Sequence, residues 1–159
     1  MQLRRYESKF NDSILALHRS AIEGFSLGMS QLQDEADLMA IELTYLDSGG
    51  EFLLGFVDDQ LVAMGGFKRL SGTLAELKRM RIKRDCQGHG YGSAMLSALE
   101  HRALEVGILT LCLETAKRRP LTLEFYRKHG YLEEGAGFYG SVETVKFSKL
   151  IDRNIEMGQ

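Results

Sequence analysis

The stretch RDCQGHGYGSAMLSALE, residues 84–100, runs from a glycine-rich loop directly into an amphipathic helical pattern. Glycines stand at positions 88, 90 and 92, and the apolar residues Met95, Leu96 and Leu99 then recur at helical spacing. Glycine permits positive φ angles and lets a ligand approach the main chain with no Cβ in the way. The N-terminus of a helix adds free backbone N–H groups and a dipole that attract anions. The loop therefore predicts a phosphate cradle, and the alternative is a tight turn that needs glycine only for its shape.

Counting residues excludes two familiar phosphate-binding motifs. A P-loop requires GxxxxGK[ST], and the chain contains no Gly-Lys pair. The dinucleotide fingerprint requires GxGxxG or GxGxxA. Counted from Gly88 its last position falls on Ser93, and counted from Gly90 it falls on Met95. The position of the loop, between a strand pattern and a helix pattern, is therefore more informative than its glycine content.

Composition and charge limit the class of protein. The chain has 159 residues, which fits a single domain spanning 1–159. Its net charge of −2 favours neither nucleic acid nor an anionic membrane as a partner. The longest apolar runs, such as Leu53 to Val57, are far shorter than the roughly 20 residues that cross a bilayer. The N-terminus MQLRRYESKF has charges where a signal peptide has its apolar segment, so we expect a cytoplasmic protein.

The cysteines and histidines form no metal-binding pattern. The two cysteines, Cys86 and Cys112, and the four histidines show no CxxC, HExxH or comparable spacing, so we expect neither a metal nor a disulfide framework. Cys86 lies beside the glycine loop, but no histidine-based constellation that would activate a nucleophile is visible around it. We expect both cysteines to be reduced.

Before the loop, the hydrophobic pattern predicts strands and two helices. The first helix begins with Asn11 or Asp12 as its N-cap and continues to Ile22. The second covers residues 34–46, with an inner side formed by Ala36, Met39, Ala40, Leu43 and Leu46. The strands are predicted at 3–6, 51–57, 60–67 and 73–82, and Asp58-Asp59 predicts a hairpin turn between the second and the third.

After the loop, helices and strands alternate. A helix runs to Gly107, a buried strand covers 108–113, and Pro120 opens a further helix that ends at Gly130. A strand around Tyr131, a glycine-rich turn and an alternating strand at 142–150 complete the chain. The order β-α-α-β-β-β-α-β-α-β-β predicts an α/β or α+β fold built on one mixed sheet.

Three segments resemble signatures of the GNAT acyltransferases. Residues 87–92, QGHGYG, match the Q/R-x-x-G-x-G/A motif with which that family binds the pyrophosphate of acetyl-CoA. Residues 75–82, AELKRMRI, are similar to its fourth strand, and residues 121–135, LTLEFYRKHGYLEEG, are similar to its tyrosine helix and the segment that follows. The resemblance implies a mixed, mostly antiparallel central sheet of six to seven strands, flanked by about four helices and splayed between the fourth and fifth strands.

The resemblance also implies acetyl-CoA as co-substrate. Main-chain groups of Met80, Arg81 and Ile82 would pair with the pantetheine arm. The pyrophosphate would be held by the loop at Gln87, Gly88, His89, Gly90, Tyr91, Gly92 and Ser93. The contacts there would be backbone amides, with the side chains of the histidine and the tyrosine pointing away.

Three neighbours of these motifs affect cofactor binding. Lys83 and Arg84 are either contacts of the nucleotide phosphates or solvated charges. Pro120 stands where many family members carry an asparagine that contacts the pantetheine. That side-chain contact is therefore not expected here.

Tyr126 matches the tyrosine that lies near the thioester sulfur in the family. It would protonate the departing CoA thiolate or donate a hydrogen bond to it. The alternative is a packed aromatic side chain with a satisfied hydroxyl.

An amine acceptor creates a need for a base. An amine with a pKa of about 10.4 is neutral in roughly one molecule in 2,500 at pH 7, so forming the nucleophile costs about 4.6 kcal/mol. We expect Glu76 to remove the proton, because it lies on a strand that should line the cleft and by alternation shares a face with Met80 and Ile82. The alternative is that Glu76 forms an ion pair with Lys78 or Arg69.

The expected activity is transfer of an acetyl group from acetyl-CoA to a small-molecule or peptide amine, by direct attack in a ternary complex. The alternatives are an acyl-CoA-binding sensor without turnover, and O-acyl or longer-chain acyl transfer.

Glu114 is the second candidate for the base. The acceptor would lie against the N-terminal helices and the last hairpin, where Tyr45, His18 and Glu23 either face it or pack. A homodimer is left open.

Overall fold

The computed structural model describes residues 1–22 and 34–152, which contain seven strands of one sheet. The strands are β1 Gln2–Arg5, β2 Glu51–Val57, β3 Gln60–Arg69, β4 Leu74–Ile82, β5 Thr110–Ala116, β6 Leu132–Tyr139 and β7 Val142–Leu150. They lie in the order β1-β2-β3-β4-β5-β7-β6, and each neighbouring pair is antiparallel except β4 and β5, which are parallel. The predicted mixed, mostly antiparallel sheet is confirmed.

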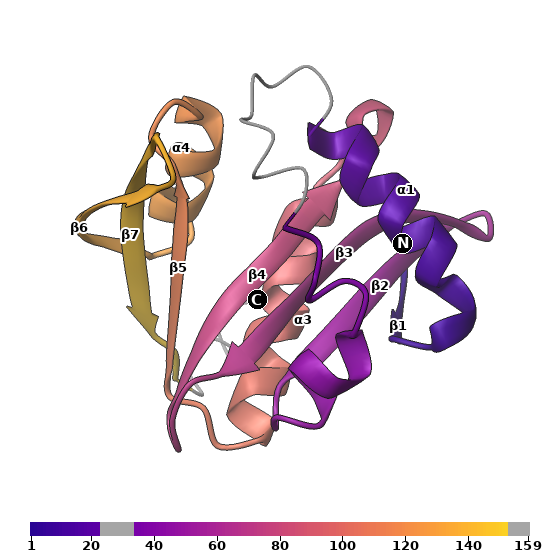
Figure 1. Cartoon of the computed structure of the whole chain (residues 1–159), viewed down its shortest axis with the longest axis horizontal. Helices are drawn as coiled ribbons and strands as arrows, with labels where there is room; N and C mark the ends of the chain where they lie inside the picture. The colour runs from indigo at the N-terminus through magenta and orange to yellow at the C-terminus, as the bar shows by residue number, and fades with distance from the viewer. Residues whose placement is uncertain (23–33, 153–159) are drawn as a thin grey trace.

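Helices cover both faces of this sheet (Figure 1). The described helices are α1 Asn11–Ile22, α3 Tyr91–Glu105 and α4 Pro120–Lys128, with the short helical turns η1 Ser8–Phe10, η2 Glu42–Leu46 and η3 Arg84–Cys86. One buried cluster joins the sheet to α3 and α4, and a second joins the opposite face to α1 and η2. Because β2 and β3 are buried on both faces, their sequences are nearly continuous apolar runs.

The sheet opens between β4 and β5. The two strands pair only from Leu74 opposite Thr110 to Glu76 opposite Cys112. Beyond that point they diverge, and α4, β6 and β7 stay with β5 (Figure 1). The predicted splay between the fourth and fifth strands is therefore confirmed. On that side, the last residues of β4 have no partner strand among residues 1–22 and 34–152.

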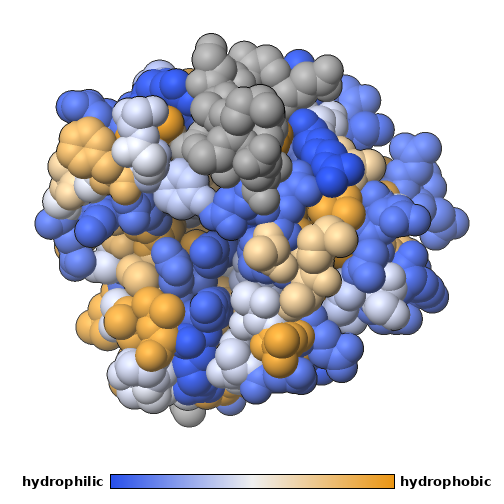
Figure 2. Space-filling view, viewed as in Figure 1, coloured by the Kyte–Doolittle hydropathy of each residue, from blue (hydrophilic) through white to orange (hydrophobic). Residues whose placement is uncertain are grey.

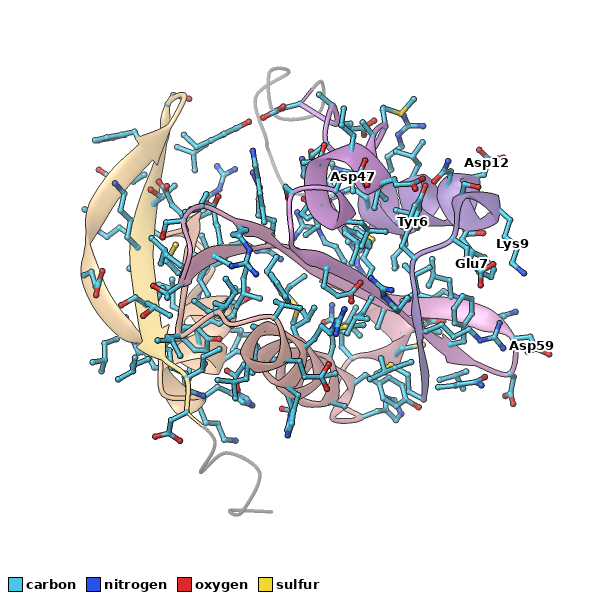
Figure 3. All side chains as sticks on the ribbon, turned by 90° about the horizontal axis from the view of Figure 1, so that it is seen from below. Tyr6, Glu7, Lys9, Asp12, Asp47 and Asp59 are labelled. Atoms are coloured by element: carbon cyan, nitrogen blue, oxygen red, sulfur yellow. The ribbon has the colours of Figure 1, made fainter. Side chains whose placement is uncertain are left out.

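The turn between β2 and β3 forms as predicted. Asp58 and Asp59 have φ angles of 50° and 63°. Two consecutive positive φ angles are typical of the type I′ hairpin turn, and aspartate tolerates that conformation better than most residues. Figure 3 shows Asp59 at the tip of this hairpin, away from β6 and β7.

A β-bulge at Arg79 reverses the side-chain alternation of β4. Gly66 pairs with Lys78, but Met64 pairs with Arg81, so β4 contains one extra residue here. Arg79 has φ 61°, in the left-handed region. The prediction that Glu76 shares a face with Met80 and Ile82 is therefore wrong. Glu76 instead shares its face with Lys78 and Arg81, toward α1 and η2.

The segment predicted as a helix over 34–46 is a series of turns followed by the π-helical η2, and its predicted inner side is wrong. Met39 and Leu43 are each 70% exposed, whereas Leu38, Ile41 and Tyr45 are buried. The buried residues recur at spacings of three and four positions, so the buried side is offset from the predicted one. Tyr45 also donates from its hydroxyl to Asp37 at 2.5 Å, which fixes its inward orientation.

Candidate active site

The glycine loop connects the end of β4 to the first turn of α3. Gly88 and Gly90 both have φ +80°, and a Cβ at either position would meet no heavy atom within 4 Å. Backbone conformation therefore favours glycine there, and the space above the loop is open. Gly92 differs, because a Cβ there would lie 3.4 Å from the Phe125 ring. Gly90 is the N-cap of α3, so the first N–H groups of that helix, which lack intrahelical acceptors, border the open space.

Two side chains of the loop turn back onto the main chain. Gln87 Nε2 donates to the Ile82 carbonyl oxygen at 3.3 Å. His89 Nδ1 lies 3.1 Å from the Cys86 carbonyl oxygen and 3.0 Å from that of Gln87, and since carbonyls only accept, Nδ1 carries the proton. The His89 ring also stacks on Tyr91, with 5.6 Å between centroids. The main chain, rather than these side chains, is left to bind a ligand.

Ser93 in the first turn of α3 is hydrogen-bonded to the neighbouring helix. His129 Nδ1 lies 2.7 Å from the Phe125 carbonyl oxygen, which assigns the ring proton to Nδ1. The other ring nitrogen, Nε2, lies 2.9 Å from Ser93 Oγ and is hydrogen-bonded to it. The Ser93 hydroxyl is thus already hydrogen-bonded within the protein.

A cleft joins the glycine loop to the opening of the sheet. A cavity of about 600 Å³, the loop cavity, lies between the end of β4, the glycine loop and the start of α4. A second cavity of about 430 Å³, the strand cavity, lies between β4, β5 and α1. The residues that line both are Met80, Arg81, Arg118, Arg119, Thr122 and Tyr126. The two cavities therefore meet, and Figure 2 shows hydrophilic side chains along the line where β5 faces β4.

The loop cavity collects most of the predicted cofactor contacts. Its lining includes Met80, Arg81, Ile82, Gln87, Gly88, Gly90, Tyr91, Gly92 and Ser93. His89 is absent from the described lining, as expected for a side chain that points away, whereas Tyr91 is part of it. Arg84 also lines this cavity, and Lys83 lies 3.9 Å from Asp85 in a surface ion pair.

Tyr126 lies at the junction of the two cavities. Its side chain packs among Phe125, Tyr131 and Phe147, with centroid distances of 5.1, 5.5 and 6.1 Å, and only 5% of the residue is exposed. Burial raises the pKa of Tyr126 to about 12, although nearby guanidinium charges oppose the shift. The residue is thus both a packed aromatic and a cleft residue, and its hydroxyl stays protonated at neutral pH.

Glu76 lines the strand cavity, where Tyr126 also lies. The predicted alternative of an ion pair with Arg69 is wrong, because Arg69 donates instead to the carbonyl oxygens of Gly49, Gly72 and Val106. No ion pair between Glu76 and any residue of 1–22 or 34–152 is present, Lys78 included. Glu76 therefore lines the cavity without an ion-pair partner in the described chain.

Glu114, the second candidate for the base, also lines the strand cavity. It accepts a hydrogen bond from the Thr144 hydroxyl of β7. A Cβ at Gly137 would lie 2.9 Å from its Oε2 atom, so the C-terminal hairpin holds this carboxylate in place.

One wall of the strand cavity is fixed by an ion pair at the bulge. Arg79 donates from Nη2 and Nε to Asp37 at 2.6 and 2.9 Å, and from Nη2 to the Asp34 carbonyl oxygen at 2.8 Å. Burial alone would raise the pKa of Asp37, but the hydrogen bonds from Arg79 and Tyr45 and the Arg79 charge lower it to about 2. Tyr45 therefore packs in this wall rather than facing the cavity, and Glu23 lies outside the described residues.

Arg81 and His18 contribute buried nitrogen atoms beside the cleft. Arg81 donates from Nη1 to the Met80 carbonyl oxygen at 3.0 Å, but its buried Nε has no partner in the described part of the chain. Burial, with smaller contributions from Arg79 and Arg119, lowers the pKa of Arg81 to about 10, so it remains charged at neutral pH.

His18 lines the strand cavity and is almost fully buried. Its two ring nitrogens make no hydrogen bond with residues 1–22 or 34–152, and Glu35 lies 3.9 Å away. Burial, followed by the charges of Arg81 and Arg79, lowers the pKa of His18 to about 4, although Glu35 opposes the shift. His18 is therefore a neutral imidazole at pH 7.

Several residues that line the cleft could not be predicted from the sequence. Arg118 and Arg119 border both cavities, as does Thr122, and Tyr139 of the last hairpin borders the strand cavity. The only signal for the two arginines is that they directly precede Pro120, which starts α4. Their position predicts that the two arginines lie at a helix N-terminus, but it does not predict that they border a cleft.

No three His, Cys, Asp or Glu side chains among the described residues lie close enough together to hold a metal ion. Over residues 1–22 and 34–152 there is also no helix with the length and apolar character to cross a membrane.

Comparisons with known proteins agree with this geometry. The sequence model of the acetyltransferase (GNAT) family matches residues 14–131. A GNAT-family acetyltransferase from Staphylococcus aureus has a similar structure, with a TM-score of 0.84 at 21% identity, covering 95% of this chain and 99% of its own. An acetyltransferase from Streptococcus agalactiae gives a TM-score of 0.81 at 15% identity over 94% and 97% of the two chains.

A third similar structure, a putative acetyltransferase from Salmonella typhimurium, was solved with its cofactor acetyl-CoA. Its TM-score is 0.78 at 12% identity, over 96% of this chain and 94% of its own. At these identities the likeness shows a shared fold. No curated protein sequence matches the chain. The family match extends from α1 to Tyr131, directly before β6, and includes β4, the glycine loop and Tyr126. The chain therefore belongs to the acetyltransferase (GNAT) family.

Proposed function

We propose that this protein transfers the acetyl group of acetyl-CoA to an amine that is bound in the same cleft. The observation that carries the proposal is the meeting of the loop cavity and the strand cavity at Tyr126. One cavity borders the anion-binding loop, and the other presents a carboxylate that has no ion-pair partner in the described chain. Direct transfer needs two binding regions that meet at one point, since the amine must reach the thioester.

The loop cavity fits acetyl-CoA. Open space above Gly88 and Gly90 leaves room for a pyrophosphate beside the N–H groups of 87–93, at the positive end of the α3 dipole. Because the Ser93 hydroxyl is already hydrogen-bonded to His129, we assign phosphate binding to the Ser93 backbone N–H. When bound, acetyl-CoA supplies the thioester carbonyl carbon that an amine attacks.

The splay supports the pairing proposed for the pantetheine arm. β4 loses its partner on the β5 side after Glu76, while its other edge still pairs with β3 through Arg81 and Ile82. An extended ligand could therefore bind to main-chain groups of Met80, Arg81 and Ile82 as an additional strand. It would share the Met80 and Ile82 carbonyl oxygens with Arg81 Nη1 and Gln87 Nε2, or displace these donors.

Tyr126 would stabilise the leaving sulfur. Its hydroxyl is protonated at neutral pH, because the pKa is raised to about 12. A thiol has a pKa of about 8.5, so complete proton transfer from Tyr126 to a free thiolate would cost about 5 kcal/mol. We therefore assign Tyr126 mainly the donation of a strong hydrogen bond to the sulfur while the carbon–sulfur bond breaks.

Glu76 would remove the proton from the incoming ammonium. It lines the cavity that borders Tyr126 and has no ion-pair partner within the described chain, so its carboxylate is available to a substrate amine directly or through one water. Glu114, held by Thr144, is the alternative base.

Binding and turnover can be tested separately. Acetyl-CoA at a hundredfold excess over its Kd should stabilise the protein by about 2.7 kcal/mol and raise Tm by several degrees. Release of the CoA thiol with a panel of amines would then distinguish an acetyltransferase from an acyl-CoA sensor. Stabilisation without thiol release for any amine would support the sensor, and absence of stabilisation would contradict both.

A further inference from the structure

Arg81 is a partly buried cation that has no ion-pair partner in the described part of the chain. The bulge directs Arg81 to the same face as Glu76, and it lines both cavities beside Tyr126. Its Nη1 donates to a carbonyl oxygen, its buried Nε has no partner, and it forms no ion pair within residues 1–22 and 34–152. Removing a charged donor from water without a partner is unfavourable, so the arrangement favours a bound anion.

The neighbouring Arg79 shows how the protein neutralises a structural arginine in the same strand. Arg79 is held by both carboxylate oxygens of Asp37, at 2.6 and 2.9 Å. Arg81 stands two positions later and has no such carboxylate. Arg119, which borders the same junction, adds positive potential there instead of offsetting it, because its charge disfavours the protonated form of Arg81.

The position of Arg81 restricts which anion it can bind. The pyrophosphate of acetyl-CoA is assigned to the glycine loop, whereas Arg81 lies beside Tyr126 at the junction of the two cavities, where it also lines the strand cavity. An anion at Arg81 would therefore belong to the acceptor and would lie close to the reacting nitrogen. A guanidinium binds a carboxylate through two parallel hydrogen bonds, a geometry that an ammonium cannot provide.

The same cavity also contains groups of the opposite charge. Glu76 and Glu114 line it and would attract an ammonium group. A ligand with a carboxylate and an amine on one carbon could place the carboxylate on Arg81 while its nitrogen stays near Tyr126 and a base. We propose that Arg81 binds the carboxylate of the acceptor and that the acceptor is an α-amino acid, an inference that rests on the acetyl transfer proposed above.

The decisive measurement compares acids with their amides. Wild-type protein is assayed for thiol release with the twenty L-amino acids and with the matching amino acid amides, which keep the amine but lack the negative charge. For the best substrate, kcat/KM should be roughly 10- to 150-fold higher for the acid, the range for one charge-assisted hydrogen-bonded pair. Arg81→Gln should remove that preference by raising KM for the acid, with little change for the amide.

Two further variants control this test. Arg81→Lys keeps the charge without the planar fork and should restore only part of the preference. Arg127→Gln removes an exposed arginine, paired with Glu133, that borders neither cavity, and it should keep the full preference. Acetyl-CoA should stabilise each variant as it does the wild type, which shows that the fold and the cofactor site are intact.

Other results would overturn the inference. Equal kcat/KM for acids and amides in the wild type would do so even if Arg81→Gln failed to fold, because that comparison needs no variant. An equal loss for both substrates in Arg81→Gln would show that Arg81 acts on the thioester instead. If amines react without any preference for a carboxylate, the transfer activity stands and only this inference fails; if acetyl-CoA does not bind, both fail.

Discussion

At the scale of single residues, the chemistry of the cleft depends on which polar groups the protein satisfies internally. Asp37 is fully engaged by Arg79 and Tyr45, and its pKa falls to about 2. Glu76 and Arg81 border the same cavity without such partners in the described chain. Polar groups that have hydrogen-bond and ion-pair partners within the protein stabilise the structure. Polar groups that lack such partners are the ones that can bind a ligand.

Replacing Tyr126 with phenylalanine tests the leaving-group role. The change removes only the hydroxyl, and the ring keeps its packing against Phe125, Tyr131 and Phe147. We expect kcat to fall about 100-fold, the lower range for a group that acts on the leaving atom, with less than about a threefold change in KM for acetyl-CoA. Steady-state kinetics provide the measurement, and an unchanged kcat would remove Tyr126 from the mechanism.

Replacing Glu76 with glutamine tests the base. At neutral pH the acceptor is mostly an ammonium, so loss of the base should lower kcat/KM about 100-fold. The loss should shrink as the pH approaches the pKa of the amine, because solvent then removes the proton. A pH–rate profile checks this, with Glu114→Gln as the matched control. A constant deficit at every pH, or a larger effect in the control, would assign the role elsewhere.

His18 makes the stability of the protein depend on pH. Its pKa is about 4 in the folded protein and about 6.5 when unfolded, so the unfolded state binds a proton more readily. The stabilisation is present above about pH 6.5 and is lost as the pH falls toward 4. Between pH 7 and pH 5 the free energy of unfolding should drop by about 1–2 kcal/mol through this group.

Urea unfolding at both pH values measures that drop. His18→Gln should remove the contribution of His18 and make the stability less dependent on pH in this range. Asp37 does not interfere, because the stability that it contributes is lost only below its unfolded pKa of about 3.8. An equal pH dependence in the variant and the wild type would show that the imidazole is not buried in its neutral form.

At the scale of elements, local sequence signals predict two turns correctly and the interior of β4 poorly, and the glycine-rich turn predicted before the last strand is wrong, because those residues belong to β6. Asp58-Asp59 and the glycine loop were predictable because specific residue types favour their positive φ angles. The bulge was not, since an arginine in the left-handed region has no such signature, and its ion pair with Asp37 joins residues far apart in sequence. Simple alternation therefore wrongly assigned Met80 and Ile82 to the face of Glu76. The clefts that contain Arg118 and Arg119 depend on packing that no local pattern encodes.

The two glycines of the loop provide a matched test of its conformation. Gly90→Ala puts a side chain at φ +80°, where an L-residue is disfavoured by about 1–2 kcal/mol, although the added Cβ meets no atom. We expect the loop to relax and acetyl-CoA to bind about tenfold more weakly. Gly72→Ala also adds a Cβ in open space, but at ordinary φ, so it should leave Kd unchanged. Calorimetric titration measures both, and equal affinities would indicate that the loop does not bind the cofactor.

At the scale of the whole molecule, the apolar core and the cleft lie in different parts of the sheet. The strands β1, β2 and β3 form a continuous antiparallel block with an apolar cluster on each face. The cleft lies where that block gives way to β5, β7 and β6, which are joined to β4 only through a short parallel ladder. A ligand can thus pair with the open edge of β4, as an additional strand would, without displacing residues of the core.

Hydrogen exchange can show which backbone amides acetyl-CoA protects. If acetyl-CoA binds along the open edge of β4 and on the glycine loop, amides in 80–82 and 87–93 should exchange more slowly in its presence, since bound groups must open before they exchange. Amides of β1 and β2, at the far edge of the sheet, provide the internal control, because global stabilisation alone would slow only those that exchange by complete unfolding. Mass-spectrometric exchange with and without acetyl-CoA distinguishes the two. Protection confined to β6 and β7 would move the cofactor away from the splay, and with it the assignments of Tyr126 and Glu76.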